Sequence, residues 1–105
     1  MKSSVIEGML LEELERNRRI FKRYQEELDK LPKGSIIKRK KNEEIYCYLH
    51  YREANKVVSK YIGKMSAIDI IDLEKQIQKR KNIRVIMQKL KVEEKELTRI
   101  VERNK

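Results

Sequence analysis

The sequence contains very few of the residues from which most small catalytic and metal sites are built. Its 105 residues include one cysteine, one histidine, one proline, three glycines and no tryptophan. A single cysteine allows no internal disulfide, and with a single histidine it falls short of the ligand set of a structural zinc site. Three isolated glycines do not form a phosphate-binding loop. We therefore expect no metal and no other cofactor.

Long hydrophobic runs are also missing. The chain has no stretch of about 18 apolar residues, so we expect no transmembrane helix. The short segment VIEGMLL, residues 5–11, is followed by acidic residues and is unlike the apolar core of a signal peptide. Together with the low cysteine content, these features predict a cytoplasmic protein that does not bind membranes.

Charge, by contrast, is abundant. Charged residues make up 42% of the chain and hydrophobic residues 39%, which favours long solvated helices with narrow apolar stripes over a thick core with an enclosed pocket. The net charge is +10. The charges of residues 1–31 sum to zero, whereas residues 32–65 carry nine basic and three acidic residues. Such an excess attracts phosphate backbones, anionic lipid or acidic proteins, and it can also serve solubility alone.

The first third of the chain, residues 1–31, has the pattern of a helix with one apolar stripe. Pro32 and Gly34 then end the helix. The stripe follows the spacing of heptad a and d positions. It consists of Leu10, Leu14, Asn17, Phe21, Tyr24 and Leu28. This seam predicts either a homodimer, in which Asn17 fixes the register, or packing against the C-terminal helix of the same chain.

Residues 33–64 change to the pattern of short strands. The runs SIIKRK, EIYCYLHY and KVVSKYI are rich in β-branched and aromatic residues and predict a three-stranded antiparallel meander. Residues 66–105 return to a helical pattern, which begins with an approximate capping box of Ser66 and Asp69. The apolar residues before and after Asn82 fall on two different stripes of the predicted helix. This change allows either a break in the helix or a stutter within a continuous helix. We therefore predict an α+β fold, a single domain over residues 1–105.

The middle strand predicts two different faces. Alternation places Ile45, Cys47, Leu49 and Tyr51 on one face, which is the better core candidate. Tyr46, Tyr48 and His50 lie on the other. Because Cys47 and His50 then point in opposite directions, they cannot act as a nucleophile and base. The paired glutamates of the helices are expected on solvated faces, and we predict no enzymatic activity.

Aromatic rings interleaved with cations favour nucleic-acid contact, because rings can rest against bases or sugars while cations hold phosphates. We expect Tyr46, Tyr48 and His50 to supply stacking or hydrogen bonds. The candidate phosphate contacts are Lys38, Lys40, Lys56, Lys60, Arg80 and Arg84. In the alternative, the Tyr46, Tyr48 and His50 row is partly buried beneath a helix or contacts another protein.

The central third also resembles a known type of sequence. KGSI (residues 33–36), YCYLHYRE (46–53) and YIGK (61–64), followed by the basic helical segment EKQIQKRKN (74–82), resemble a signature of small proteins from Firmicutes and their phages or mobile elements. A similar YIGK hairpin occurs in the N-terminal parts of some transposases. The outline is more loosely similar to the DNA-binding sheets of recombinase arm-binding domains. The resemblance implies a β-meander between helices and a mobile-element setting. The turn REAN departs from the pattern by lacking a glycine, and Cys47 replaces a common aromatic residue.

Three functional hypotheses follow from these features. The first is a non-enzymatic basic protein that contacts nucleic acid or a nucleoprotein complex through the sheet and the adjacent helix. The alternative is a protein-interaction module, such as a phage-encoded, anti-CRISPR-like inhibitor or a regulator of a host defence complex. The third is a small helix-turn-helix within residues 86–104, which requires a turn near Val92.

Overall fold

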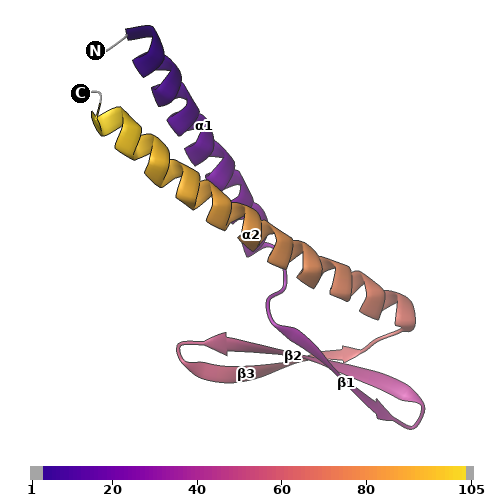
Figure 1. Ribbon diagram of the computed structural model, residues 1–105. Helices are drawn as coiled ribbons and strands as arrows, with labels where there is room; N and C mark the ends of the chain where they lie inside the picture. Colours follow the sequence, from indigo (N-terminus) through magenta and orange to yellow (C-terminus); the bar gives the residue numbers. More distant parts are fainter. Residues whose placement is uncertain (1–3, 104–105) are drawn as a thin grey trace. The chain divides into compact units, whose positions relative to one another are not determined.

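The computed structural model describes residues 4–103. Helix α1 (Ser4–Asp29) is followed by strands β1 (Ser35–Lys41), β2 (Glu44–Glu53) and β3 (Lys56–Lys64), and by helix α2 (Ala67–Arg103) (Figure 1). The predicted α+β fold is therefore confirmed, with a three-stranded antiparallel meander between two long helices. Residues 1–3 and 104–105 of the predicted helices lie outside the described part of the chain. In this part, no helix has an apolar stretch long enough to cross a membrane.

Helix α2 is continuous over 37 residues. It begins with the predicted capping box, in which the Asp69 amide donates to Ser66 Oγ (3.2 Å) and the Ser66 amide donates to Asp69 Oδ2 (3.4 Å). The helix runs through Asn82 and Val92 without a break. Of the two alternatives at Asn82, the stutter within a continuous helix is therefore correct. The helix-turn-helix hypothesis is wrong, because it requires a turn near Val92 and the chain is helical there.

The described residues fall into two compact units. One consists of residues 4–30 and 82–103, and the other of residues 31–81, so that α2 contributes to both. The single-domain prediction is not decided by this division and stays a prediction.

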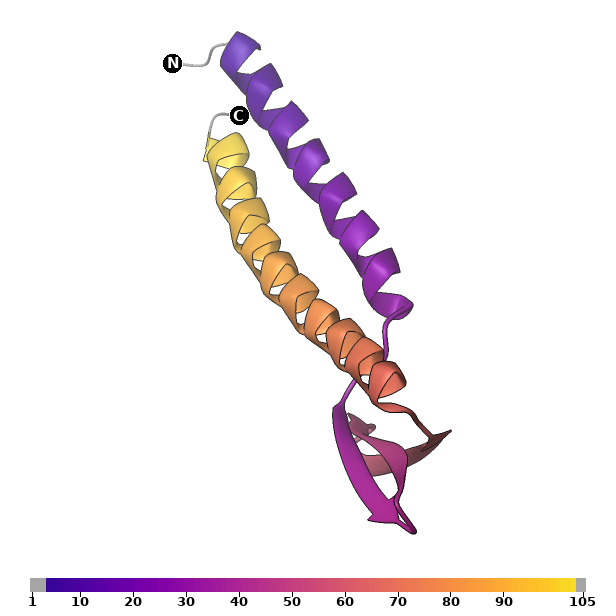
Figure 2. The ribbon, with the colours of Figure 1, turned by 90° about the vertical axis from the view of Figure 1, so that its right-hand side faces the viewer.

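In the helical unit, α1 and the C-terminal part of α2 run antiparallel and side by side (Figure 2). Leu14, Asn17 and Leu28 of the seam are buried, and so are Ile83 and Met87 of α2. The remaining seam residues, Leu10, Phe21 and Tyr24, are half-buried. Apolar burial along this narrow stripe holds the pair together.

Asn17 joins the two helices by hydrogen bonds from a buried position. Its side chain is only 3% exposed, and its Nδ2 atom donates to the Leu90 backbone oxygen (3.1 Å) and to Glu93 Oε2 (3.4 Å). Nearby, Lys91 Nζ lies 5.3 Å from the centre of the Phe21 ring. Within this chain the seam packs against α2, as the second of the two predictions has it, and the homodimer stays a prediction.

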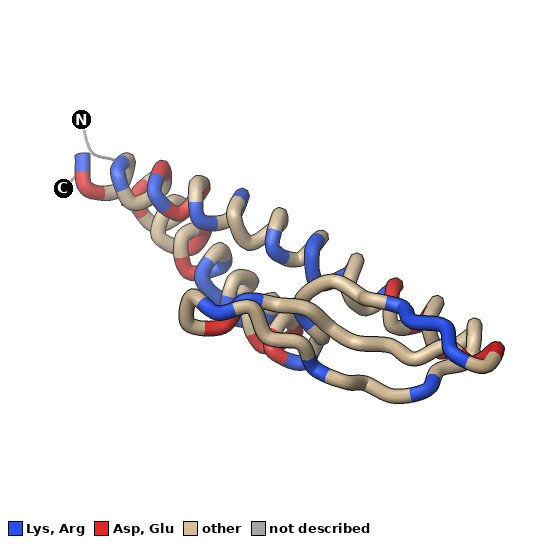
Figure 3. The backbone as a smooth tube through the Cα atoms, turned by 90° about the horizontal axis from the view of Figure 1, so that it is seen from below, with Lys and Arg blue, Asp and Glu red and all other residues tan. Residues whose placement is uncertain are grey.

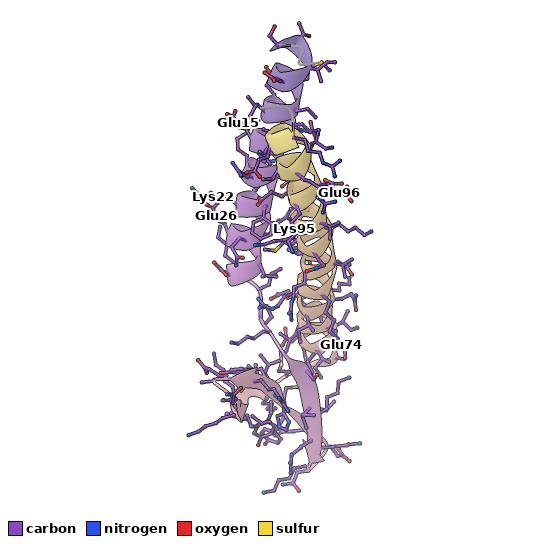
Figure 4. All side chains as sticks on the ribbon, turned by 60° about the vertical axis from the view of Figure 1, so that its left-hand side comes forward. Glu15, Lys22, Glu26, Glu74, Lys95 and Glu96 are labelled. Carbon is purple, nitrogen blue, oxygen red and sulfur yellow. The ribbon has the colours of Figure 1, made fainter. Side chains whose placement is uncertain are left out.

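The opposite side of α1 is a solvated face, as its charge pattern predicts. Glu15, Lys22 and Glu26 are exposed and point away from α2 (Figure 4). A helix with charges on one side and apolar residues on the other is stabilised mainly by the packing of its apolar side.

In the sheet unit, the strand order is β1-β2-β3 with antiparallel pairing throughout. Both hairpins have two-residue turns. Asn42 and Glu43 have φ values of 52° and 65°, and Ala54 and Asn55 have φ values of 48° and 66°. Positive φ at both central residues is the mark of the type I′ turn, which matches the twist of the flanking strands. The REAN turn thus forms without the glycine that this geometry favours.

Gly34 allows the chain to enter the sheet. Its φ is 104°, and a Cβ atom at this position would lie 2.2 Å from the His50 backbone oxygen. Only glycine has room there, because even the smallest side chain would overlap the backbone of β2.

The predicted core face of β2 is confirmed at Cys47 and Leu49, whereas Ile45 and Tyr51 on the same face are half-buried. Cys47 is fully buried and Leu49 is 5% exposed, and the first turns of α2 contribute buried Ile70 and Ile77. Lys38 Nζ, on the same side of the sheet, lies 2.8 Å from Glu74 Oε1 of α2 (Glu74 is labelled in Figure 4). The N-terminal part of α2 therefore lies over the Cys47 side of the sheet.

Candidate nucleic-acid interface

The other side of the sheet carries a cluster of tyrosines, which we name the tyrosine face. Tyr48 of β2 lies opposite Tyr61 of β3, and Tyr46 lies opposite Arg39 of β1. These side chains surround an open hollow of about 680 Å³. Its lining residues are Arg39, Lys41, Asn42, Tyr46, Tyr48 and Tyr61.

The rings of this face are in contact with each other and with a cation. The Tyr48 and Tyr61 ring centres are 5.2 Å apart, with their planes tilted by 50°. The Arg39 guanidinium carbon lies 5.8 Å from the Tyr48 ring centre. Tyr46 and Tyr48 are half-buried, whereas Tyr61 is 55% exposed. The row is thus not sealed off as a core would be, and it presents ring surface to solvent.

A hydrogen-bonded group stands beside the hollow. Glu44 Oε2 accepts a hydrogen bond from the Tyr46 hydroxyl (2.9 Å), and Glu44 Oε1 lies 2.5 Å from Lys64 Nζ. The hydrogen bond from Lys64, and then that from Tyr46, holds the pKa of the Glu44 carboxyl below its usual value. For the same reason, hydrogen bonding to Glu44 raises the pKa of Tyr46 and that of Lys64.

A β-bulge places Lys64 on this side. Cys47 pairs with Gly63 while the next residue, Tyr48, pairs with Tyr61, so that Ile62 is an extra residue in β3. An extra residue reverses the alternation that follows it. Gly63, with a φ of 130°, supplies the backbone freedom that the bulge needs. Lys64 therefore lies opposite Tyr46 and reaches Glu44.

The structure does not bring the predicted lysines to the tyrosines. Lys38 lies opposite Cys47, Lys40 opposite Ile45, and Lys60 opposite Leu49, so all three belong to the core side of the sheet. Lys56, opposite Glu53, follows the same alternation. Lys38 is engaged by Glu74, whose hydrogen bond raises the pKa of the Lys38 amine.

The remaining predicted residues are scattered. His50 is half-buried between Ser35 and Ser59, on the tyrosine side but away from the hollow. Arg80 donates to the Leu31 backbone oxygen (3.4 Å) from within α2. Arg84 is exposed on the part of α2 that belongs to the helical unit.

Four of the six lining residues were not among the predicted contacts, namely Arg39, Lys41, Asn42 and Tyr61. The basic run at the end of β1 is visible in Figure 3, and Arg39 and Lys41 alternate within it with Lys38 and Lys40. A prediction of a two-residue turn at Asn42 and Glu43 would have selected Arg39 and Lys41 as the cations beside the tyrosines. Such a turn sets Lys41 opposite Glu44 and therefore Arg39 opposite Tyr46.

Acidic, histidine and cysteine side chains do not gather into a metal site in the part of the chain that the structure describes. Over residues 4–103, no three of them are grouped in a way that could hold an ion.

Comparison with known proteins gives a family but no activity. No curated protein and no solved structure matches the chain. Residues 10–72 match the model of a family described as a domain of unknown function (DUF6788). The match covers more than half of the chain and includes most of α1, the whole sheet and the first turns of α2. The chain therefore belongs to the DUF6788 family.

Proposed function

We propose that this is a non-enzymatic protein that binds nucleic acid, free or within a nucleoprotein complex, through the tyrosine face. The observation that carries the proposal is the hollow, where three tyrosines stand beside Arg39 and Lys41 on the side of the sheet opposite buried Cys47. Aromatic rings offer surfaces to bases or sugars, and cations at the rim attract phosphates.

The charge distribution supports the same ligand. The net charge is +10, and the segment that contains the sheet has a large share of the excess. A polyanion gains affinity for such a surface by releasing its condensed counterions. The expected location, the cytoplasm, and the expected setting, a phage or mobile element, are part of this proposal.

A salt titration tests the proposal. Fluorescence anisotropy would be measured with a labelled duplex and a labelled single strand at about 50 mM and about 200 mM salt. We expect binding at the lower concentration and a steep loss of affinity at the higher one. Absence of binding to both probes at about 50 mM would refute the proposal.

A second candidate function is contact with another protein. Ile68 and Ile71 lie one turn apart on α2 and are 79% and 52% exposed. Exposed apolar side chains on one helix face suit a protein partner, such as the defence complex that a phage-encoded inhibitor would bind. Replacing both with Ser is expected to abolish capture of such a partner and to leave nucleic-acid affinity unchanged, because the substitution adds no charge.

A further inference from the structure

We infer that the tyrosine face binds unpaired bases, so that its ligand is a single strand or an unpaired loop rather than a duplex. The inference rests on the proposed function and deepens it by naming the ligand class. It follows from the geometry of the rings, from the charge around the hollow and from the size of the hollow.

The rings are arranged to accept the flat side of a base. Because Tyr48 and Tyr61 are tilted by 50°, the two rings do not cover each other face to face. Tyr61 is 55% exposed, so much of its surface is open to a ligand. In a duplex, each base is already covered by its neighbours in the stack. Only an unpaired, unstacked base has a free face to lay against tyrosine.

The charge around the hollow is small for a duplex-binding surface. Two of its six lining residues, Arg39 and Lys41, are cations, and three are tyrosines. Lys64 is close by, but Glu44 offsets its charge. Duplex binding depends mainly on many contacts to phosphates, whereas single-strand binding combines a few cations with stacking. The ratio of rings to cations favours the single strand.

The hollow is large enough for bases that leave the stack. Its volume of about 680 Å³ is in the range of pockets that hold small molecules, roughly 300–1,000 Å³. Asn42 lies at its rim, in the turn between β1 and β2. An amide can both donate to and accept from the edge of a base, so Asn42 gives the hollow a means of distinguishing one base from another.

The test compares strands that share a length and differ in pairing. Labelled oligo(dT), oligo(rU) and a blunt hairpin with the same number of phosphates would be titrated at about 50 mM salt. We expect at least one single strand to bind about tenfold more tightly than the hairpin. Preference for the ribose or the deoxyribose strand would support the inference and identify the sugar.

Two variants of one residue separate stacking from other roles. Tyr61→Phe keeps the ring and is expected to keep the affinity for single strands, whereas Tyr61→Leu is expected to lose about tenfold. Lys60→Ala, on the other side of the sheet, is the control and is expected to change the affinity by about twofold or less. Because Tyr61 is 55% exposed, the Leu variant is expected to fold, and circular dichroism would verify this.

The possible failures can be told apart. The inference would be overturned if the hairpin bound as tightly as the single strands, or more tightly, and if Tyr61→Leu had the same affinity as the unaltered protein. The proposed function would then still stand. Absence of binding to all three probes would overturn both, and binding to a protein alone would do the same.

Discussion

Asn17 and Leu90, 73 positions apart, are joined by a hydrogen bond of 3.1 Å between the Asn17 side-chain amide and the Leu90 backbone oxygen. The bond crosses the helical unit at a buried position, and the Asn17 Oδ1 atom on the same side chain is buried with no hydrogen-bond partner among residues 4–103. A buried asparagine in an apolar seam lowers stability while it fixes the alignment of the helices.

Replacing Asn17 with Leu should therefore stabilise the helical unit. We expect the free energy of unfolding to rise by about 1 kcal/mol, because an unsatisfied polar group is removed from the seam. Urea denaturation measures this change. Light scattering on the same sample would report whether the apolar seam now pairs two chains. A less stable variant would mean that the hydrogen bond contributes more than the burial of the amide costs.

Replacing Gly34 with Ala should destabilise the sheet unit severely. The new Cβ would meet the His50 backbone oxygen at 2.2 Å, and φ at this position is 104°. We expect a loss of about 3 kcal/mol or more in urea denaturation. Gly63→Ala is the matched control, since its φ is 130° but a Cβ there meets nothing within 4 Å. Its loss should be nearer 1 kcal/mol, and equal losses would contradict the steric explanation.

Replacing Ala54 with Gly should stabilise the second hairpin. Ala54 adopts a φ of 48°, which a side chain disfavours and glycine accepts. We expect a gain of about 0.5–1 kcal/mol in the free energy of unfolding. Lys40→Gly, within β1, is the control and should lower stability, because glycine weakens a strand. A loss for Ala54→Gly would show that the turn is not strained.

The Glu44 group should give a distinctive pH dependence. The pKa of the Glu44 carboxyl is lower in the folded protein than its value of 4.5 in the unfolded chain. The ionised carboxyl therefore contributes to stability above pH 4.5, and this contribution is lost as the pH falls through the pKa of the folded protein. In Glu44→Gln this acid-side loss should be smaller. The pKa of Tyr46, raised by Glu44, should move back toward 10.0, as measured by NMR titration of the ring. An unchanged Tyr46 pKa would contradict the hydrogen bond.

The two faces of β1 should differ in nucleic-acid binding. Arg39 and Lys40 are neighbours with the same charge, but Arg39 lies opposite Tyr46 and Lys40 lies opposite Ile45. Replacement by Gln removes one positive charge in each case. We expect Arg39→Gln to weaken binding about tenfold and Lys40→Gln only about twofold, as measured by anisotropy at one salt concentration. Equal losses would indicate attraction by net charge without a defined face.

The order of the elements could be predicted because its signals are local. Ser66 and Asp69 mark the start of α2 within one turn, and alternation in β2 separates buried Cys47 from the tyrosines. Each of these patterns depends only on residues a few positions apart.

The composition of the candidate site could be predicted only in part. Tyr46 and Tyr48 were found from the alternation of their own strand, but the choice of cations depends on how β1 and β3 are aligned with it. A shift of one residue moves every side chain to the other face, and this is the difference between Lys40 and Arg39. Lys64 lies on the tyrosine side only because of the bulge at Ile62 and Gly63. An isolated glycine in the sequence is not a sufficient signal to predict a bulge.

The sequence by itself determined two long helices around a meander, the solvated faces of the helices and the buried side of β2, because these follow from helical and strand periods along one segment. The tertiary structure decided that the seam pairs with α2 of the same chain, that α2 continues past Asn82, and that Arg39 and Lys41 join the tyrosines. Those outcomes depend on which distant segments meet and in which register. The spacing of apolar residues within one segment does not determine the energies of such contacts.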